Sequence, residues 1–284
     1  MTVETTVTTV SNGGDGGGGT TSSETTQVSV RPVCWYEQTN LSGADMAARI
    51  GPEGAHTMVE SGLESYASHA AEDGRWYRAT CDPHADPEAL KAEVRKFWMV
   101  TRRWRWVPAG QEPPAPVIDA RTLVRAAMGA VRIPVPEVET NPRVTTGDGV
   151  SGATVVGLDT WVWATGETPS QVRVTASAGS LSATVVASAS GLRVSAPDSV
   201  PSCTGWGSPW VPGQSQEGGS DCTVEFTRSS AHLGGTTPLT VSVGYDVAWT
   251  ATDGTSGTLD PITTTSTTDL PVAEIQTINR DTNH

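Results

Sequence analysis

Apolar and polar residues alternate along most of the chain after residue 153, and this pattern predicts an all-β region. Val, Thr and Ser recur with a period of two in segments of strand length, separated by turn signals such as Gly179 and Asp253-Gly254. The expected strands are 154–158, 160–164, 171–177, 181–187, 190–196, 222–227, 238–250, 257–268 and 270–277. Short alternating strands in this number are typical of an immunoglobulin-like β-sandwich, which we place at residues 151–278.

The pattern in residues 27–107 is mixed and predicts a small α/β domain. Strands are expected at QVSVRPVCWY, at GRWYR and around Trp104 and Trp106, and helical spacing occurs at 43–49, at 55–71 and after Pro87. Residues 108–150 read as a proline-rich linker with one short helix, from Asp119 as N-cap to about Gly129. The expected fold class is therefore α+β and multidomain.

The first 26 residues differ from the rest in composition. They are Thr, Gly and Ser with almost no large apolar side chain. Such a segment gains too little from burial to offset its ordering entropy, so residues 1–26 are predicted to be a disordered tether.

Four cysteines change this picture, because they lie in two local pairs. Cys34 and Cys81 bracket the small domain, and Cys203 and Cys222 bracket a loop in the β-region. Disulfides at 34–81 and 203–222 are one of three pairings, and they indicate a secreted or cell-surface protein. Neither a signal peptide nor a long apolar segment is visible, so we expect that a leader or anchor is missing from this sequence. If the native chain starts at Met1, four free thiols are the alternative.

The net charge of −13 makes some partners poor candidates. An acidic, Thr-rich surface repels nucleic acid and anionic lipid, so we expect no nucleic-acid partner and no membrane insertion by this chain.

An ordered series of short motifs between residues 117 and 277 resembles a known group of proteins. VIDARTLVRAAMGAVRIPVPEVETNP, followed by VVGLDTWVWAT, is similar to secreted or envelope-associated actinobacterial proteins of uncharacterised function. Their C-terminal half resembles PKD-type domains, so the resemblance implies an immunoglobulin-like sandwich. It supplies no activity, and RVSAPDSVPS stands where a PKD domain has its Trp-x-Phe-Gly-Asp-Gly hairpin, so no PKD surface role is carried over.

Tryptophans provide the candidate binding residues. Trp206 and Trp210 lie in the loop between Cys203 and Cys222, where they suggest either a pinned recognition loop or a stapled strand connection. Trp161 and Trp163 project from one face of a strand, either as a glycan platform or, as is more common, as part of a packed face.

No catalytic or metal motif stands out. HExxH, G-x-S-x-G and P-loop patterns are absent from the sequence, as is a Rossmann fingerprint between a strand and a helix, and Cys81-Asp82-Pro83-His84 lacks zinc-finger spacing. We therefore predict no catalytic residues, no metal and no cofactor.

The first functional hypothesis is an exported cell-envelope binding or assembly protein without catalytic activity, whose partner is a protein or a cell-wall glycan. Self-association into an extracellular filament is a variant, with the Thr-rich segment 262–270 as the joining edge. The alternative is a secreted hydrolase or hydrolase accessory with a site in residues 27–107. That alternative requires His69, His84 and nearby acids to converge in one pocket.

Overall fold

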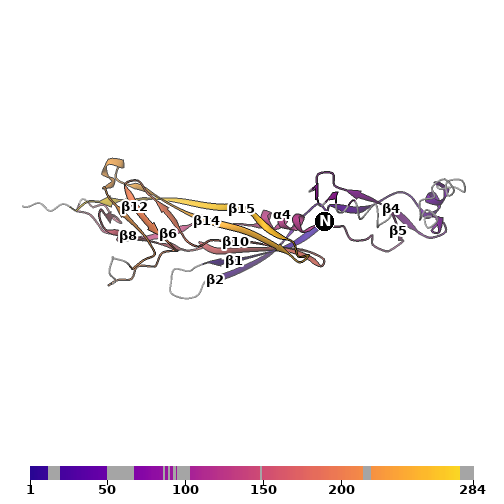
Figure 1. Ribbon diagram of the computed structural model, residues 1–284, viewed down its shortest axis with the longest axis horizontal. Helices are drawn as coiled ribbons and strands as arrows, with labels where there is room; N and C mark the ends of the chain where they lie inside the picture. Colours follow the sequence, from indigo (N-terminus) through magenta and orange to yellow (C-terminus); the bar gives the residue numbers. More distant parts are fainter. Residues whose placement is uncertain are drawn as a thin grey trace, which may run out of the picture.

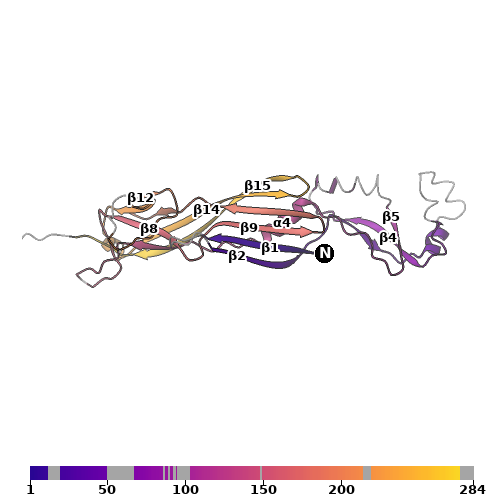
Figure 2. The ribbon, with the colours of Figure 1, turned by 90° about the horizontal axis from the view of Figure 1, so that it is seen from below.

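The computed structural model describes residues 1–11, 20–49, 67–85, 87–88, 90–91, 94, 103–147, 149–213 and 219–275. The molecule is elongated, with the strands of its largest sheet running along the long axis (Figure 1). A small sheet containing β4 and β5 lies at one end, and strands β8 and β12 lie toward the other, which we call the distal end (Figure 2).

The largest sheet has seven strands among the described residues and is antiparallel throughout. Its order is β2-β1-β9-β10-β14, and both β11 and β15 pair with β14. The strands are β1 (Thr2–Ser11), β2 (Thr20–Ser29), β9 (Pro169–Ala178), β10 (Leu181–Ser188), β11 (Arg193–Ser195), β14 (Thr237–Ala251) and β15 (Ser256–Leu270).

A second antiparallel sheet has the order β12-β13-β8-β6. Its strands are β12 (Ser199–Cys203), β13 (Cys222–Phe226), β8 (Asp159–Thr165) and β6 (Glu137–Asn141). Two short strands, β7 (Thr154–Val155) and β16 (Val272–Ala273), pair in parallel, and a 3-10 turn η1 spans Ser230–Leu233. The predicted β-sandwich character of the chain is thus confirmed at the level of packed antiparallel sheets.

One face of the large sheet carries the core. Alternate residues such as Val172 and Val174 on β9, Val185 on β10 and Val243 on β14 are fully buried, as the period of two requires. They join one cluster with Val224 of β13 and with residues of the helix α4. The other face has no such cover within the described residues and is rich in Thr and Ser, for example along the row Thr25, Thr6, Thr175, Thr184 and Thr250.

The helix α4 (Ala120–Ala130) begins where the sequence predicts. The Asp119 side chain accepts a hydrogen bond from the Thr122 N–H at 3.0 Å, which caps the first turn. Leu123 and Ala127 are fully buried against β1, β9 and β10. The helix is therefore part of the sandwich core and not part of a linker, which corrects the predicted boundary of residues 108–150.

The N-terminal segment also departs from its prediction. In the described part of residues 1–26, β1 and β2 form a hairpin, and β1 is inserted between β2 and β9. Val3 and Thr5 are fully buried, and the Thr5 hydroxyl donates to the Thr26 carbonyl at 3.1 Å. The low apolar content of this segment pointed to disorder. The strands form nevertheless, because Thr has high strand propensity and pairing with β9 supplies the burial that the segment lacks alone.

The small sheet lies within an insertion between β2 and α4, residues 31–117, which we call the lobe. It contains β3 (Cys34–Gln38), β4 (Gly74–Cys81) and β5 (Trp104–Pro108), with a helical turn at 43–49. Two antiparallel hydrogen bonds close its neck: the Val33 N–H donates to the Val117 carbonyl, and the Val117 N–H donates to the Cys34 carbonyl. Most of the helix predicted at 55–71 lies outside the described residues.

The position of β1 in the large sheet generates a test. Val3→Ala removes two methyl groups from a fully buried site, so we expect the free energy of unfolding to fall by about 2 kcal/mol. Glu4→Ala, on the exposed side of the same strand, is the control and should change it by less than about 0.5 kcal/mol. Urea unfolding followed by tryptophan fluorescence measures both, and equal, negligible effects would restore the tether interpretation.

Candidate functional site

Both predicted disulfides form, and each joins residues that lie directly opposite each other on antiparallel strands. Cys34 pairs with Cys81 across β3 and β4, and Cys203 pairs with Cys222 across β12 and β13. Sheet pairing itself thus brings the sulfurs together. Within the part of the chain that the structure describes, no cysteine is free.

The loop between Cys203 and Cys222 folds back against the second sheet. The Ala164 N–H of β8 donates to the Trp206 carbonyl at 2.8 Å, and the Leu192 N–H donates to the Gly205 carbonyl at 2.8 Å. Glycines make these close approaches feasible: a β-carbon at Gly207 would overlap the Val162 carbonyl oxygen and Trp163. The first part of the loop is therefore fixed structure.

The four candidate tryptophans are buried to different extents. Trp161 is 1% exposed and Trp163 is 8% exposed, so the hypothesis that they form a surface platform for glycans is wrong. Trp206 is half-buried and packs against the main core. Trp210 is also half-buried, with its indole nitrogen enclosed. Alternation in the sequence predicted that Trp161 and Trp163 share a face but could not show that both are buried or that the loop at Gly207 packs against Trp163.

What the loop does expose follows Trp210. Val211 is 53% exposed, and Pro212 and Gly213 are exposed beside it. No sequence pattern marks these residues, because a single Val in a Gly- and Pro-rich stretch carries no periodic signal. They are the accessible part of the predicted recognition loop, while residues 214–218 lie outside the described residues.

The lobe carries an aromatic cluster at the end farther from the neck. The His69 ring stacks on Trp106 with ring centroids 5.0 Å apart and meets the edge of Trp76 at 5.5 Å. The His69 Nδ1 and the Glu72 carboxylate are 2.7 Å apart. Trp76 is 2% exposed, so this cluster is a small core in which His69 is a packing residue.

The second lobe histidine is remote from that cluster. His84 is 86% exposed on its side chain and contacts Asp82 just beyond β4, whereas His69 packs at the Trp76 end of the same strand. Six residues of extended chain separate Trp76 from Asp82, about 20 Å. The convergence that the hydrolase hypothesis requires is therefore not found in this structure.

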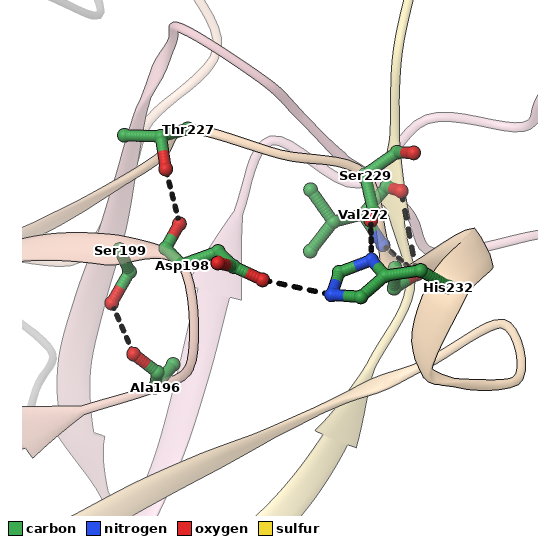
Figure 3. Close-up of polar contacts among 8 residues, drawn as sticks. Ala196, Asp198, Ser199, Thr227, Ser229, His232 and Val272 are labelled. Carbon is green, nitrogen blue, oxygen red and sulfur yellow. Dashed lines mark hydrogen bonds and ion pairs between the residues drawn. The ribbon is translucent and has the colours of Figure 1, made fainter.

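A third histidine is held at the distal end, in the contacts drawn in Figure 3. His232 Nε2 lies 2.9 Å from Asp198 Oδ2, and its Nδ1 lies 2.9 Å from the Ser229 carbonyl oxygen. Both ring nitrogens of His232 therefore lie within hydrogen-bond distance of an oxygen of the protein. No sequence motif marks this pair, which joins η1 to the turn before β12.

Asp198 is the other half of this contact and has an unusual backbone. Its φ is +51°, the left-handed region that few residues other than glycine adopt. Its carbonyl accepts from the Thr227 N–H at 2.8 Å and from the Thr227 hydroxyl at 3.0 Å. The contact between Asp198 and His232 therefore holds two turns of the chain together.

A shallow groove of about 430 Å³ lies beside η1. Hydroxyl and small apolar residues line it, including Thr146, Ser230, Ala153 and Pro271, and Glu274 is its single charged residue among the described ones. The Ser230 hydroxyl is committed to the Gly235 carbonyl at 2.7 Å and to the backbone of Val272. The groove thus offers shape, backbone polarity and one carboxylate, and its buried Ser230 hydroxyl is already hydrogen-bonded within the fold.

Among the described residues, no group of His, Cys, Asp and Glu is arranged to hold a metal ion. No described helix has both the length and the apolar character needed to span a bilayer.

These features define the class of protein only broadly: a β-rich protein with two disulfides, which is compatible with an extracellular or otherwise oxidising compartment. Comparison with known proteins found no matching family model, no matching curated protein and no matching solved structure. The resemblance to PKD-type and actinobacterial envelope proteins accordingly stays a prediction.

The close approach at Gly207 can be tested against a matched glycine. Gly207 and Gly213 both have positive φ, 77° and 93°, but a β-carbon at Gly213 would have no neighbour within 4 Å. We expect Gly207→Ala to lower the free energy of unfolding by about 1–3 kcal/mol more than Gly213→Ala does. Acrylamide quenching of tryptophan should also rise for Gly207→Ala alone, and equal effects of the two variants would argue against the packed loop.

The lobe should respond to acid through Asp82. The His84 N–H donates to Asp82 Oδ1 at 3.0 Å, which holds the pKa of that carboxyl below its ordinary 3.8, and Arg31 adds a favourable charge. A lowered pKa stabilises the fold above pH 3.8, and this contribution is lost as the pH falls through the lowered pKa. Urea unfolding of the wild type and Asp82→Asn should therefore differ at neutral pH and converge in acid. A constant difference at every pH would contradict this assignment.

Proposed function

We propose that this chain is an exported, non-catalytic protein that acts at the cell surface by binding and assembly. The observation that carries the proposal is the long antiparallel sheet, which leaves one Thr-rich face and two edge strands uncovered among the described residues. Surfaces of this kind bind other strands or other proteins. The two disulfides support the exported location.

The histidines described above support the absence of catalysis. His69 is packed between tryptophans, His84 is on the surface, and His232 has both nitrogens engaged. A catalytic site needs a base within hydrogen-bond reach of a second reacting group, and these three contacts lie on separate parts of the fold.

A protein partner is favoured over a cell-wall glycan. Glycan platforms need exposed aromatic faces, but Trp161 and Trp163 are buried and Trp206 packs on the core. The exposed Val211 side chain beside Trp210, by contrast, has no polar atom that could bind a glycan hydroxyl and can make only apolar contacts.

The test is the state of the cysteines and the location of the chain in its native host. Protein isolated without reductant should show the bonds 34–81 and 203–222 by mass spectrometry of unreduced peptides. Protease applied to intact cells should remove it, while a cytosolic marker survives. Four free thiols on a chain in the cytosolic fraction would overturn the proposal.

The disulfide between Cys203 and Cys222 also leads to a quantitative prediction. Closing a loop of 19 residues contributes about 3 kcal/mol in the chain-entropy model, so the double substitution Cys203→Ser/Cys222→Ser should lower the free energy of unfolding by about that amount. The Cys34–Cys81 disulfide closes a loop of 47 residues, so the double substitution Cys34→Ser/Cys81→Ser should lower the free energy of unfolding by about 4 kcal/mol. Unchanged denaturation midpoints on reduction would show that the bonds do not form.

A further inference from the structure

The large sheet ends in two uncovered strands that are complementary to each other. Among the described residues, β2 pairs only with β1, and β15 pairs only with β14. Each free edge presents a row of N–H and C=O groups that a further strand can pair with. Both strands are long, 10 and 15 residues.

The register shows which backbone groups of β15 point outward. The Thr252 N–H, just after β14, donates to the Ser182 carbonyl on the β10 side. Backbone groups alternate sides along a strand, so even-numbered residues of β14 face β10 and odd-numbered ones face β15. Thr264 lies opposite Val243 and so pairs inside the hairpin. Its neighbours Thr263 and Thr265 therefore direct their backbone groups outward.

The same argument applies to β2. The Val30 N–H donates to the Met1 carbonyl, so even-numbered residues of this strand face β1. The residues that point outward are Thr21, Ser23, Thr25, Gln27 and Ser29. Their side chains lie on the Thr-rich face, as do those of Thr263 and Thr265, which oppose Gly244 and Ser242.

Strand parity decides how two copies can meet. The path β2-β1-β9-β10-β14-β15 has six strands, and every neighbouring pair in it is antiparallel. The two edges consequently run in opposite directions. A second copy in the same orientation places its β2 antiparallel to β15 of the first, with both Thr-rich faces on one side and the outward groups facing each other.

The side chains select a register. Charged residues and proline disfavour strand pairing at a sheet edge, and β15 carries Asp260, Pro261 and Asp269. Residues 262–268, which lie between them, carry no charge and no proline. Pairing Thr25 with Thr265 sets residues 21–29 against 261–269 and keeps Pro261 and Asp269 at the ends. Threonines on this face already pair across strands, since the Thr6 and Thr25 hydroxyls are 3.1 Å apart.

We propose that copies of this chain join edge to edge, β15 of one to β2 of the next, in a continuous antiparallel sheet that grows into a filament. The joining surfaces differ, so the interface is heterologous, and each added copy leaves a free β15 or β2 edge that can bind the next copy. The inference deepens the assembly role proposed above and rests on it. Backbone hydrogen bonds add little net free energy each, so the filament should form only at high local protein concentration.

The experiment uses variants that block one edge each. Thr265→Pro removes an outward N–H from β15, and Thr25→Pro does the same on β2, while the internal ladder of each hairpin is kept. Thr265→Ala and Thr25→Ala are matched controls that lose the same side chains but keep the N–H. In sedimentation velocity of oxidised protein, wild type and Ala variants should form concentration-dependent oligomers, and each Pro variant should be monomeric. An equimolar mixture of the two Pro variants should form a dimer and nothing larger.

Charge variants test the register without a change to the backbone. In the doubly substituted chain Thr25→Lys/Thr265→Lys, like charges oppose each other at every junction, so assembly should be lost. Thr25→Glu/Thr265→Lys places opposite charges there, so assembly should return and weaken with salt. Circular dichroism confirms that each variant is folded.

Two results would overturn the proposal. Self-association of Thr25→Pro by itself would mean that identical edges pair, and a wild type that is monomeric at every accessible concentration would mean that neither edge joins. Both results are distinct from failure of the proposed function, because the cysteine and localisation measurements are made on the single chain.

Discussion

The constraint on which the structure depends is that the large sheet buries one face only. Strand side chains alternate, so each strand contributes half its residues to the core and leaves the other half in solvent. Val in the buried rows and Thr or Ser in the exposed rows follow from this along β9, β10 and β14. The helix α4 and the second sheet complete the core on that same side, which leaves the remaining face and the two sheet edges without cover among the described residues.

The insertion of the lobe is a second consequence of how this sheet is built. The hairpin β1–β2 completes one edge of the sheet before the chain leaves for the lobe, and the chain returns at Val117 to begin α4. The outgoing and returning segments pair at the neck, and the disulfide between Cys34 and Cys81 lies beside that pair. Because β1 and α4 share one core, residues on both sides of the lobe stabilise a single unit.

The polar contacts of Ser230, Asp198 and His232 involve residue types that are common in catalytic sites, but here they join segments of the fold. Ser230, buried at 3% exposure, ties η1 to β16 through its hydroxyl, and the Asp198–His232 pair ties the same turn to β12. The Ser230 hydroxyl thus satisfies backbone groups of Gly235 and Val272 at a buried position, whereas Asp198 and His232 join two exposed turns.

The sequence alone determined the local features of this protein. Period-two alternation predicted the long strands, and Asp119 predicted the start of α4, because each depends on neighbours a few residues away. The cysteine positions favoured the pairing 34–81 and 203–222 among three, and the pairing of the strands that carry the cysteines decided it. Only the tertiary structure decided the rest. The Thr-rich start forms strands because β1 pairs with β9. The strand β12 forms at a sheet edge although it contains Pro201. Trp163 is covered by a loop that Gly207 allows to approach closely. These outcomes depend on contacts between residues far apart in the chain, and local propensity is too weak to specify such contacts.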